Sequence, residues 1–325
     1  MKRDEYVTLR RGADMANACC CYIVNQGYLL PTLLSARQAR AAVGIDVADV
    51  IVFCVGARNP SSSVYEAAYV ESGIQFYFIP SILIEDLPIM FARFFLHKFL
   101  DPKYESVLYI DGDTQIAGCL DPLLTAIVEP GTFLAARDPM SILLDNKSYK
   151  KNTSYLQSIG IGPNMAKLYC NSGVIRLNLP DWKEISERVM RLSAARGHSF
   201  KFPDQDPLNI AFGETYQTMS YKWNFPIFFW GLGFQDQISP KILHFMSNPR
   251  PWDGPFKPWG QPCFDAYDKL TDQFPQLKPL RKRINHLHYI KYHIQQYYKH
   301  FFELPLWNTP EVRRRIMEIE QESYI

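Results

Sequence analysis

The sequence predicts an α/β fold, in which strands and helices alternate around a parallel sheet. Three short apolar runs, 18–24, 49–55 and 74–79, have the length and composition of buried strands. The first two are followed by apolar residues at helical spacing, in segments 29–41 and 61–72. This alternation is typical of a parallel sheet covered by helices, in which ligands bind at the carboxyl ends of the strands.

The composition is that of an ordinary globular chain. With 325 residues, 47% hydrophobic residues and a net charge of +2, the chain is large enough for one α/β domain with an appendage. The small net charge argues against a nucleic-acid partner, and no run of 18 apolar residues predicts a membrane span. Residues 1–14 are charged and lack the apolar core of a signal peptide, so the expected localisation is cytoplasmic. The seven cysteines have no zinc-type spacing and are expected to be reduced.

A fourth apolar run, 105–110, is expected to be a buried strand, and it ends in Asp111-Gly112-Asp113. In an extended chain, alternate residues point to the same side, so the two carboxylates would project together as ligands of one hard cation. Gly112 has no Cβ and would let a bulky anionic partner approach the backbone.

Two other interpretations of these carboxylates are open. Asp-Gly is also a common hairpin turn without any ligand. A calcium loop fits less well, because Gln115 and Ile116 stand where a further oxygen ligand and a glycine belong, and Pro122 replaces the final glutamate.

Segment 88–100 is expected to be a helix that begins near Pro88 and is apolar on almost every side. A helix of this kind is buried, yet it carries Arg93. A buried guanidinium needs an anionic partner, so Arg93 is either the structural partner of a carboxylate or a cation that binds a ligand.

The second half of the chain adds further candidate residues. Segment 170–178 is expected to be a strand that opens with a small polar triplet including Asn171, and Asp181 is expected to cap the next helix. Segment 203–209, with Asp204 and Gln205, opens another helix, where a surface N-cap is the simpler interpretation. Strand 241–245 leads His244 into a loop rich in proline and tryptophan.

Four motifs in this order resemble glycosyltransferase family 8, which includes bacterial lipooligosaccharide galactosyltransferases and glycogenin. They are YIDGDTQI (109–116), CNSGVIRLN (170–178), DQDPLN (204–209) and HFMSNPRPW (244–252), within a resemblance that runs from about 18 to 252. The resemblance implies a GT-A fold, a Rossmann-like mixed sheet flanked by helices that binds a nucleotide-sugar. It also implies a donor that is usually UDP-linked, a divalent metal that is usually manganese, and transfer with retention of anomeric configuration.

The resemblance also assigns roles to residues. Asp111, Asp113 and His244 would be metal ligands, and Arg93 and Asn171 would lie near the donor. Asp204 and Gln205 would contact the transferred sugar, with the Gln205 amide oxygen stabilising the oxocarbenium-like carbon. An imidazole among oxygen ligands favours Mn²⁺, with Mg²⁺ as the alternative.

The segment after the first strand departs from the family pattern. Many members have acidic or amide side chains there to hold the uracil and ribose, whereas this chain has Asn25 and Gln26 and no Asp. Asn25 is the expected replacement in donor binding, and the preference for uridine is an open point.

The family motif H-x-x-G-x-x-K-P-W fits this sequence in two registers. Counting from His244 keeps every spacing but puts Ser247 and Arg250 in place of glycine and lysine. Counting back from Lys257 restores both residues but leaves Pro251 where the histidine belongs. We favour the first register, because it keeps the metal ligand and the diphosphate cation on one short loop, and Arg binds two phosphate oxygens.

The chain divides by composition into a glycosyltransferase domain, 1–265, and a basic, aromatic helical extension, 266–325. Segment 278–299 has six Lys or Arg and no acid, and apolar residues are expected on one helical face: Leu280, Ile284, Leu287, Ile294, Tyr298 and Phe301. This segment is either a solvated helix packed on the domain or, over 278–302, an attachment site for an anionic membrane.

The expected function is metal-dependent, retaining transfer of a hexosyl residue from a nucleotide-sugar to a cell-surface glycolipid or polysaccharide acceptor. A sugar nucleotidyltransferase is the alternative enzyme, although a glycine-rich, lysine-bearing phosphate loop is not found near the N-terminus. A non-catalytic sugar-nucleotide-binding protein of the same fold is the other alternative.

Overall fold

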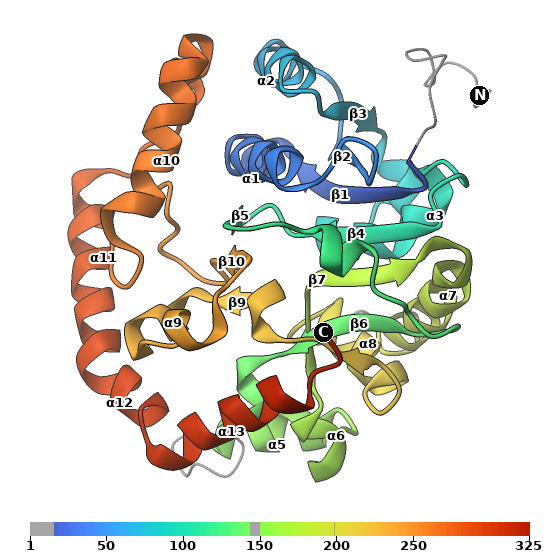
Figure 1. Cartoon of the computed structure of the whole chain (residues 1–325), viewed down its shortest axis with the longest axis vertical. Coiled ribbons are helices and arrows are strands. Elements are labelled where there is room, and N and C mark those ends of the chain that lie inside the picture. Colours follow the sequence, from blue (N-terminus) through green and yellow to red (C-terminus); the bar gives the residue numbers. More distant parts are fainter. Residues whose placement is uncertain (1–15, 144–149, 198) are drawn as a thin grey trace.

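The computed structural model describes residues 16–143, 150–197 and 199–325 (Figure 1). It contains the predicted α/β architecture, a sheet with helices on both faces. The charged segment 1–14, on which the expected localisation partly depends, lies outside the described residues. Within the described ranges, no helix combines the length and the hydropathy needed to span a bilayer.

The central sheet, as far as the structure describes it, has seven strands in the order β3-β2-β1-β4-β7-β6-β8. β1 pairs in parallel with β2 and β4, and β2 with β3, whereas β7 is antiparallel to β4 and β6. The predicted mixed α/β sheet is therefore confirmed. The strands are β1 (Ala18–Asn25), β2 (Asp49–Val55), β3 (Gln75–Ile79), β4 (Ser106–Ile110), β6 (Phe133–Arg137), β7 (Cys170–Asn178) and β8 (Gln217–Thr218).

Both faces of this sheet are buried, which explains why its strands are continuous apolar runs. In β1, Cys20 and Tyr22 pack into the core under α1 (Leu29–Ala42) and α2 (Pro60–Glu71). Cys19 and Cys21 point to the opposite core, which is covered by α7 (Leu179–Ala195) and α8 (Gln205–Phe212). All seven cysteines lie in described segments and are free, and only Cys119 among them is exposed.

The other described elements are mostly short. They are η2 (Gln26–Tyr28), η3 (Ser81–Ile84), η4 (Ile89–Phe95), α3 (Leu96–Phe99), α4 (Asp121–Leu124), η5 (Pro139–Ser141), α5 (Lys150–Ser158), α6 (Pro163–Lys167), η7 (Tyr221–Trp223), η8 (Ile227–Leu232) and α9 (Gln235–Ile238). The C-terminal part contains α10 (Gly260–Gln273), η9 (Pro275–Leu280), α11 (His286–Tyr298), the π-helical turn η10 (Lys299–Glu303), α12 (Leu304–Trp307) and α13 (Pro310–Glu322).

A second, small sheet lies beside the end of β4, with strand order β5-β10-β9. It consists of β5 (Thr114–Ile116), β10 (Ile242–His244) and β9 (Phe225–Pro226). The chain passes from the large sheet to the small one through a turn at Gly112 and Asp113. The expected extended geometry of Asp111 and Asp113 was therefore wrong. Packing against α1 also explains why residue 112 is a glycine, since a Cβ there would overlap Thr32 Oγ1.

The predicted helix over 88–100 was only partly correct. The segment is a 3₁₀ helix, η4, followed by one α-helical turn, α3. In a continuous α-helix, the Arg93 carbonyl would accept a hydrogen bond from the N–H four residues later. Here it accepts a hydrogen bond from Trp182 Nε1 at 2.7 Å. Contact with α7 thus satisfies the backbone where the helix changes type.

The predicted cap at Asp181 was wrong. α7 begins at Leu179, two residues earlier, because the Leu179 N–H bonds to the Glu105 carbonyl and Asn178 takes the N-cap position. The Asp181 carboxylate instead accepts a hydrogen bond from the Gly131 N–H at 3.1 Å.

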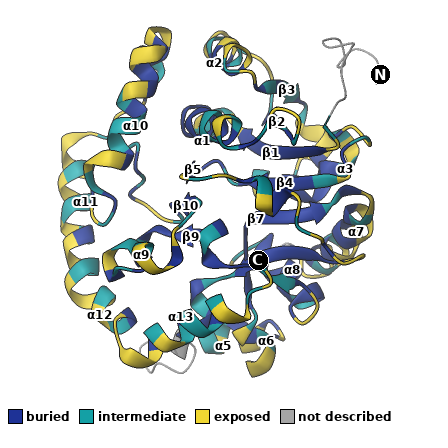
Figure 2. Ribbon diagram, viewed as in Figure 1, coloured by how far each residue is buried: buried dark blue, intermediate teal, exposed yellow. Residues whose placement is uncertain are grey.

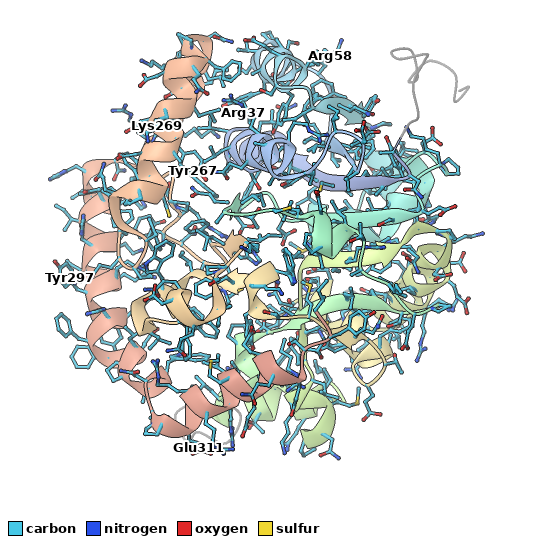
Figure 3. The ribbon with its side chains drawn as sticks, in the orientation of Figure 1. Arg37, Arg58, Tyr267, Lys269, Tyr297 and Glu311 are labelled. Carbon is cyan, nitrogen blue, oxygen red and sulfur yellow. The ribbon has the colours of Figure 1, made fainter. Side chains whose placement is uncertain are left out.

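The C-terminal part presents an exposed apolar surface, which we call the tail face. It is formed by Leu287, Ile294, Tyr297, Tyr298, Phe301 and Phe302. Figure 2 shows α11 as largely exposed, and Figure 3 shows Tyr297 on its outer side. The expected face was wrong for Leu280 and Ile284, which precede α11 and pack against the core instead.

α13 brings the chain back to the central sheet (Figure 1). Its residues Val312, Ile316 and Ile319 are buried in the core that also contains α1. At its end, Glu320 accepts hydrogen bonds from Ser220 Oγ at 2.5 Å and Tyr221 N at 2.7 Å. We call this end, residues 320–325, the C-terminal strap. The domain division at residue 265 falls inside α10 and remains a proposal.

Candidate active site

Asp111, Asp113 and His244 converge where the two sheets meet. One ligand atom from each of the three residues lies within 4.8 Å of the others. Antiparallel pairing of β5 with β10 sets His244 opposite Thr114, and the Phe245 N–H bonds to the Asp113 carbonyl at 3.0 Å. Two carboxylates and one imidazole are a suitable ligand set for a divalent cation such as Mn²⁺.

The close approach of His244 explains a glycine in one of the sequence motifs. A Cβ on Gly173 would overlap His244 Cε1 and crowd Asp111. The Asp111 N–H also donates to the Gly173 carbonyl at 2.7 Å, so β7 supports the start of the carboxylate turn.

The two carboxylates have different electrostatic surroundings. Burial raises the pKa of Asp111 and outweighs the lowering effect of Arg93. Burial would also raise the pKa of Asp113, but His244 and Arg250 together hold it well below its usual range. His244 Nε2 lies 3.4 Å from Asp113 Oδ1, and Arg250 Nη1 forms an ion pair with Asp113 Oδ2. A bound cation would favour the charged form of both carboxylates.

Arg93 is a buried partner of carboxylates on two sides of the site. Its Nη2 is 3.1 Å from Asp111 Oδ1, and its Nη1 is 3.4 Å from Asp204 Oδ2 and donates to the Ser172 carbonyl. Burial opposes the charge, but Asp111 and the other anionic neighbours prevail and raise the pKa of Arg93. The structure thus shows the carboxylate partners that the sequence required.

The predicted residues Asn171, Asp204 and Gln205 lie around Ser172, and all three are buried. Ser172 Oγ donates to Asp204 Oδ2 at 2.7 Å, and the Ser172 N–H donates to Gln205 Oε1 at 3.0 Å. Asp204 occupies the N-cap position of α8 but makes no capping hydrogen bond, so the simpler N-cap interpretation does not describe its side chain.

Sequence reasoning missed Asp138 and Asn224. Asp138 Oδ2 accepts hydrogen bonds from Asn171 Nδ2 at 2.9 Å and Gln205 Nε2 at 3.2 Å. Asn224 is buried between Asn171 and His244. An acid directly after strand β6 was a usable signal for Asp138, whereas Asn224, in a short loop among aromatic residues, offered none.

In the segment after β1, the side chains of Asn25 and Gln26 are hydrogen-bonded within the protein, which leaves fewer polar groups for a donor than the sequence suggests. The Asn25 side chain caps η2 by accepting from the Gly27 N–H at 2.9 Å. Gln26 bonds to the Ala57 carbonyl and to Asn59. Tyr28, which sequence reasoning did not assign, lies edge-to-face with Trp252, with ring centroids 5.7 Å apart.

The loop after His244 brings Arg250 to the carboxylates, and Ser247 on the same loop is exposed. Lys257 lies elsewhere, with its ammonium 5.1 Å from the Tyr297 ring centroid. Trp259 is buried and donates to the Gly254 carbonyl. Thus Arg250 from the favoured register contacts the predicted metal ligand Asp113, while Lys257 from the other register contacts Tyr297 on α11.

Comparison with known proteins gives relatives of one kind. The sequence model described as glycosyl transferase family 8 matches residues 85–263. The lipopolysaccharide 1,2-glucosyltransferase of Escherichia coli is 26% identical over 125 residues, covering 37% of this chain and 33% of the relative. Glycosyltransferase GlyE of Streptococcus pneumoniae is 25% identical over 175 residues, 50% of this chain and 37% of the relative. The matches thus span about a third of the length of these two proteins.

Solved structures show the same fold at low sequence identity. The galactosyltransferase LgtC, in complex with donor and acceptor sugar analogs, has a TM-score of 0.60 and 17% identity, covering 78% of this chain and 95% of that one. The bifunctional glycosyltransferase WbbM has a TM-score of 0.61 and 15% identity, covering 98% of this chain and 54% of that one. With the family model matching more than half of the sequence, the chain belongs to glycosyltransferase family 8, an assignment that confirms the motif resemblance.

Proposed function

We propose that this protein is a retaining, metal-dependent hexosyltransferase that uses a nucleotide-sugar donor, UDP-linked in the simplest case. The observation that carries the proposal is the convergence of Asp111, Asp113 and His244 beside the hydrogen-bonded group Asn171, Asp138 and Gln205. The first group suits a cation that binds a diphosphate, and the second suits a sugar rich in hydroxyl groups.

Asp111, Asp113 and His244 would hold Mn²⁺, with Mg²⁺ as the alternative. When bound, the cation neutralises the negative charge that develops on the departing diphosphate. Arg250 adds a guanidinium beside these ligands, where it is suited to bidentate contact with phosphate oxygens.

The residues on the sugar side orient the donor rather than form a bond to it. Gln205 is held at both ends, since its amide nitrogen donates to Asp138 and its amide oxygen accepts from the Ser172 N–H. The second lone pair of this oxygen, which Ser172 Oγ approaches only at 3.4 Å, would face the oxocarbenium-like carbon. Asp204 is paired with Arg93, which makes it a support for this group. No side-chain base is required if the departing phosphate oxygen takes the proton of the acceptor hydroxyl.

For the acceptor, we propose a cell-surface glycolipid or polysaccharide precursor. The similarity to the lipopolysaccharide 1,2-glucosyltransferase of Escherichia coli supports this class. So does the tail face, which carries exposed apolar side chains beside the basic residues Lys291 and Lys299. Such a surface suits the interface of an anionic membrane, where each basic residue contributes about 1 kcal/mol. The proposed localisation is therefore cytoplasmic and peripheral on the inner membrane face.

A panel of nucleotide-sugars tests the proposal. In the presence of Mn²⁺, we expect one UDP-hexose to raise the melting temperature and to be hydrolysed slowly without acceptor, and a chelator should abolish both effects. Binding without hydrolysis or transfer would favour the non-catalytic alternative. Formation of a nucleotide-sugar from a sugar phosphate and a nucleoside triphosphate would favour the nucleotidyltransferase.

A further inference from the structure

A continuous series of hydrogen-bonded side chains joins the predicted metal site to the sugar side. His244 Nδ1 lies 2.8 Å from Asn224 Oδ1, and Asn224 Nδ2 donates to Asn171 Oδ1 at 2.9 Å. Asn171 Nδ2 in turn donates to Asp138 Oδ2 at 2.9 Å. The four residues come from four separate parts of the chain. Asn224, in the middle of the series, is only 2% exposed.

Asp138 sets the direction of every hydrogen bond in this series. A carboxylate only accepts, so Asn171 must turn its NH₂ toward Asp138 and its carbonyl toward Asn224. The Gly173 N–H donates to the same Asn171 carbonyl at 3.0 Å, which agrees with this orientation. Asn224 must therefore donate with its NH₂ and present its carbonyl to the imidazole of His244.

The same logic places the proton of a neutral His244 imidazole. Because the Asn224 carbonyl can only accept, His244 must donate from Nδ1. Nε2 then keeps its lone pair on the side of Asp113, where a metal ion would bind. In the other tautomer, Nε2 would carry a hydrogen toward Asp113 and would no longer be able to bind a cation.

The Asp138 end of the series is anchored. Asp138 Oδ1 accepts from the Met140 N–H at 2.9 Å, which fixes the rotation of the carboxylate. Asp138 Oδ2 also accepts from Gln205 Nε2, so one oxygen serves both the series and the sugar side.

We propose that Asn224 is a positioning residue that connects the two halves of the site. It holds His244 in the tautomer that leaves Nε2 free for the metal, and it holds Asn171 with its NH₂ toward Asp138. The inference rests on the metal site of the proposed function and deepens it, but its main measurement needs neither metal nor donor.

The test compares tautomer and metal affinity in matched variants. Asn224→Leu removes both hydrogen bonds at similar volume, while Asn224→Asp keeps an acceptor for His244 and loses the donor to Asn171. In metal-free protein labelled with ¹⁵N-histidine, wild type and Asn224→Asp should show His244 protonated at Nδ1, and Asn224→Leu should show a mixture of tautomers. Mn²⁺ affinity, followed by electron paramagnetic resonance, should fall by about 10- to 100-fold in Asn224→Leu. It should be retained or increased in Asn224→Asp.

Asn209→Leu is the control for general loss of packing. Asn209 is equally buried and bonds to the backbone of Cys170, but it does not contact His244. Asn209→Leu should lower the free energy of unfolding without changing the His244 tautomer. If Asn224→Leu does not fold, Asn224→Ala provides a second route, because it also removes both hydrogen bonds and should yield mixed tautomers.

An unchanged tautomer in Asn224→Leu, or in Asn224→Ala where that variant replaces it, would overturn the inference. An altered tautomer with unchanged Mn²⁺ affinity would also overturn it. A wild-type protein that shows the Nδ1 tautomer and binds Mn²⁺ but transfers no sugar would contradict the proposed function and leave the inference standing.

Discussion

At the scale of single residues, Asp113 contacts two cationic or potentially cationic side chains, His244 and Arg250. We expect Asp113→Asn to keep the fold, because the amide has the same shape, and to lower metal-dependent turnover by at least about a hundredfold. Donor hydrolysis across a Mn²⁺ titration measures this. Unreduced turnover at every Mn²⁺ concentration would contradict the proposed metal site.

Arg250 and Lys257 are the two candidates, one from each motif register, for the positively charged side chain that binds the diphosphate. Arg250 lies at the carboxylates, whereas Lys257 packs over Tyr297. We expect Arg250→Ala to reduce donor hydrolysis by about 10- to 100-fold at saturating Mn²⁺, since it removes charge-assisted hydrogen bonds. Lys257→Ala should have little effect. The opposite order would show that the lysine reaches the phosphates and that the favoured register is incorrect.

Sequence reasoning located residues that carry a motif and missed residues that only topology brings together. Asp111, His244 and Asn171 could be proposed because their local patterns are distinctive. Asp138 follows a strand that has no recognisable motif, and Asn224 lies between two aromatic residues; they reach the site only because β6 and β7 are neighbours and β9 pairs with β10. Strand pairing over these distances in sequence was not predictable from residue patterns.

At the scale of secondary structure, the buried strands were predicted better than the helices. The strands that were predicted agree with the structure within one or two residues, because burial on both faces produces an apolar run, although the buried strand β6 was not predicted. Segment 88–100 differed, since its helix type depends on the contact between the Arg93 carbonyl and Trp182 on a distant helix. The carboxylate turn differed for a similar reason, as Gly112 packs against α1.

The tail face gives a prediction at this scale. Ile294 and Phe301 are 65% and 62% exposed, so replacing both by serine should not disturb the fold. We expect the double variant to bind anionic vesicles at least about tenfold more weakly, because it loses apolar area at the membrane interface. Donor hydrolysis should be unchanged.

Ile127→Ser is the matched control for vesicle binding. Ile127 is 74% exposed on another part of the surface, so its replacement should leave vesicle binding unchanged. Equal binding by the double variant and wild type would remove the membrane hypothesis.

At the scale of the whole molecule, the C-terminal strap connects the tail to the segments that carry Asn224 and Asp138. Glu320 bonds to Ser220 and Tyr221, shortly before Asn224. Glu322 is 3.2 Å from Arg137, directly before Asp138. These contacts hold the end of the tail against the segments that carry active-site residues.

Glu320 provides a test of this connection. Glu320→Ala leaves two donors without their acceptor and should lower the free energy of unfolding by about 1–3 kcal/mol. Burial raises the pKa of Glu320 despite the hydrogen bonds from Ser220 and Tyr221, so the folded state holds the proton more tightly than the unfolded state. This contribution to stability is full below the unfolded pKa, near 4.5, and is lost as pH rises through the folded value.

Glu320→Gln removes that titration while keeping an acceptor. Its stability relative to wild type should therefore be greatest near neutral pH and should decrease as pH falls toward 4.5. Denaturant unfolding at several pH values measures the difference. A difference that does not depend on pH, or that grows as pH falls, would show that the folded state does not raise the pKa of this carboxyl.

The return of α13 to the sheet also has a consequence for how the protein is made. Glu320 lies 100 residues after Ser220, its partner. At typical rates of translation, about 5 to 20 seconds separate the synthesis of these two residues. For most of that interval, once His244 has been added, the three predicted metal ligands exist in the nascent chain, but the segment before Asn224 has no strap. A ribosome-bound chain should therefore acquire a fully ordered active site only after residues 320–325 have left the exit tunnel.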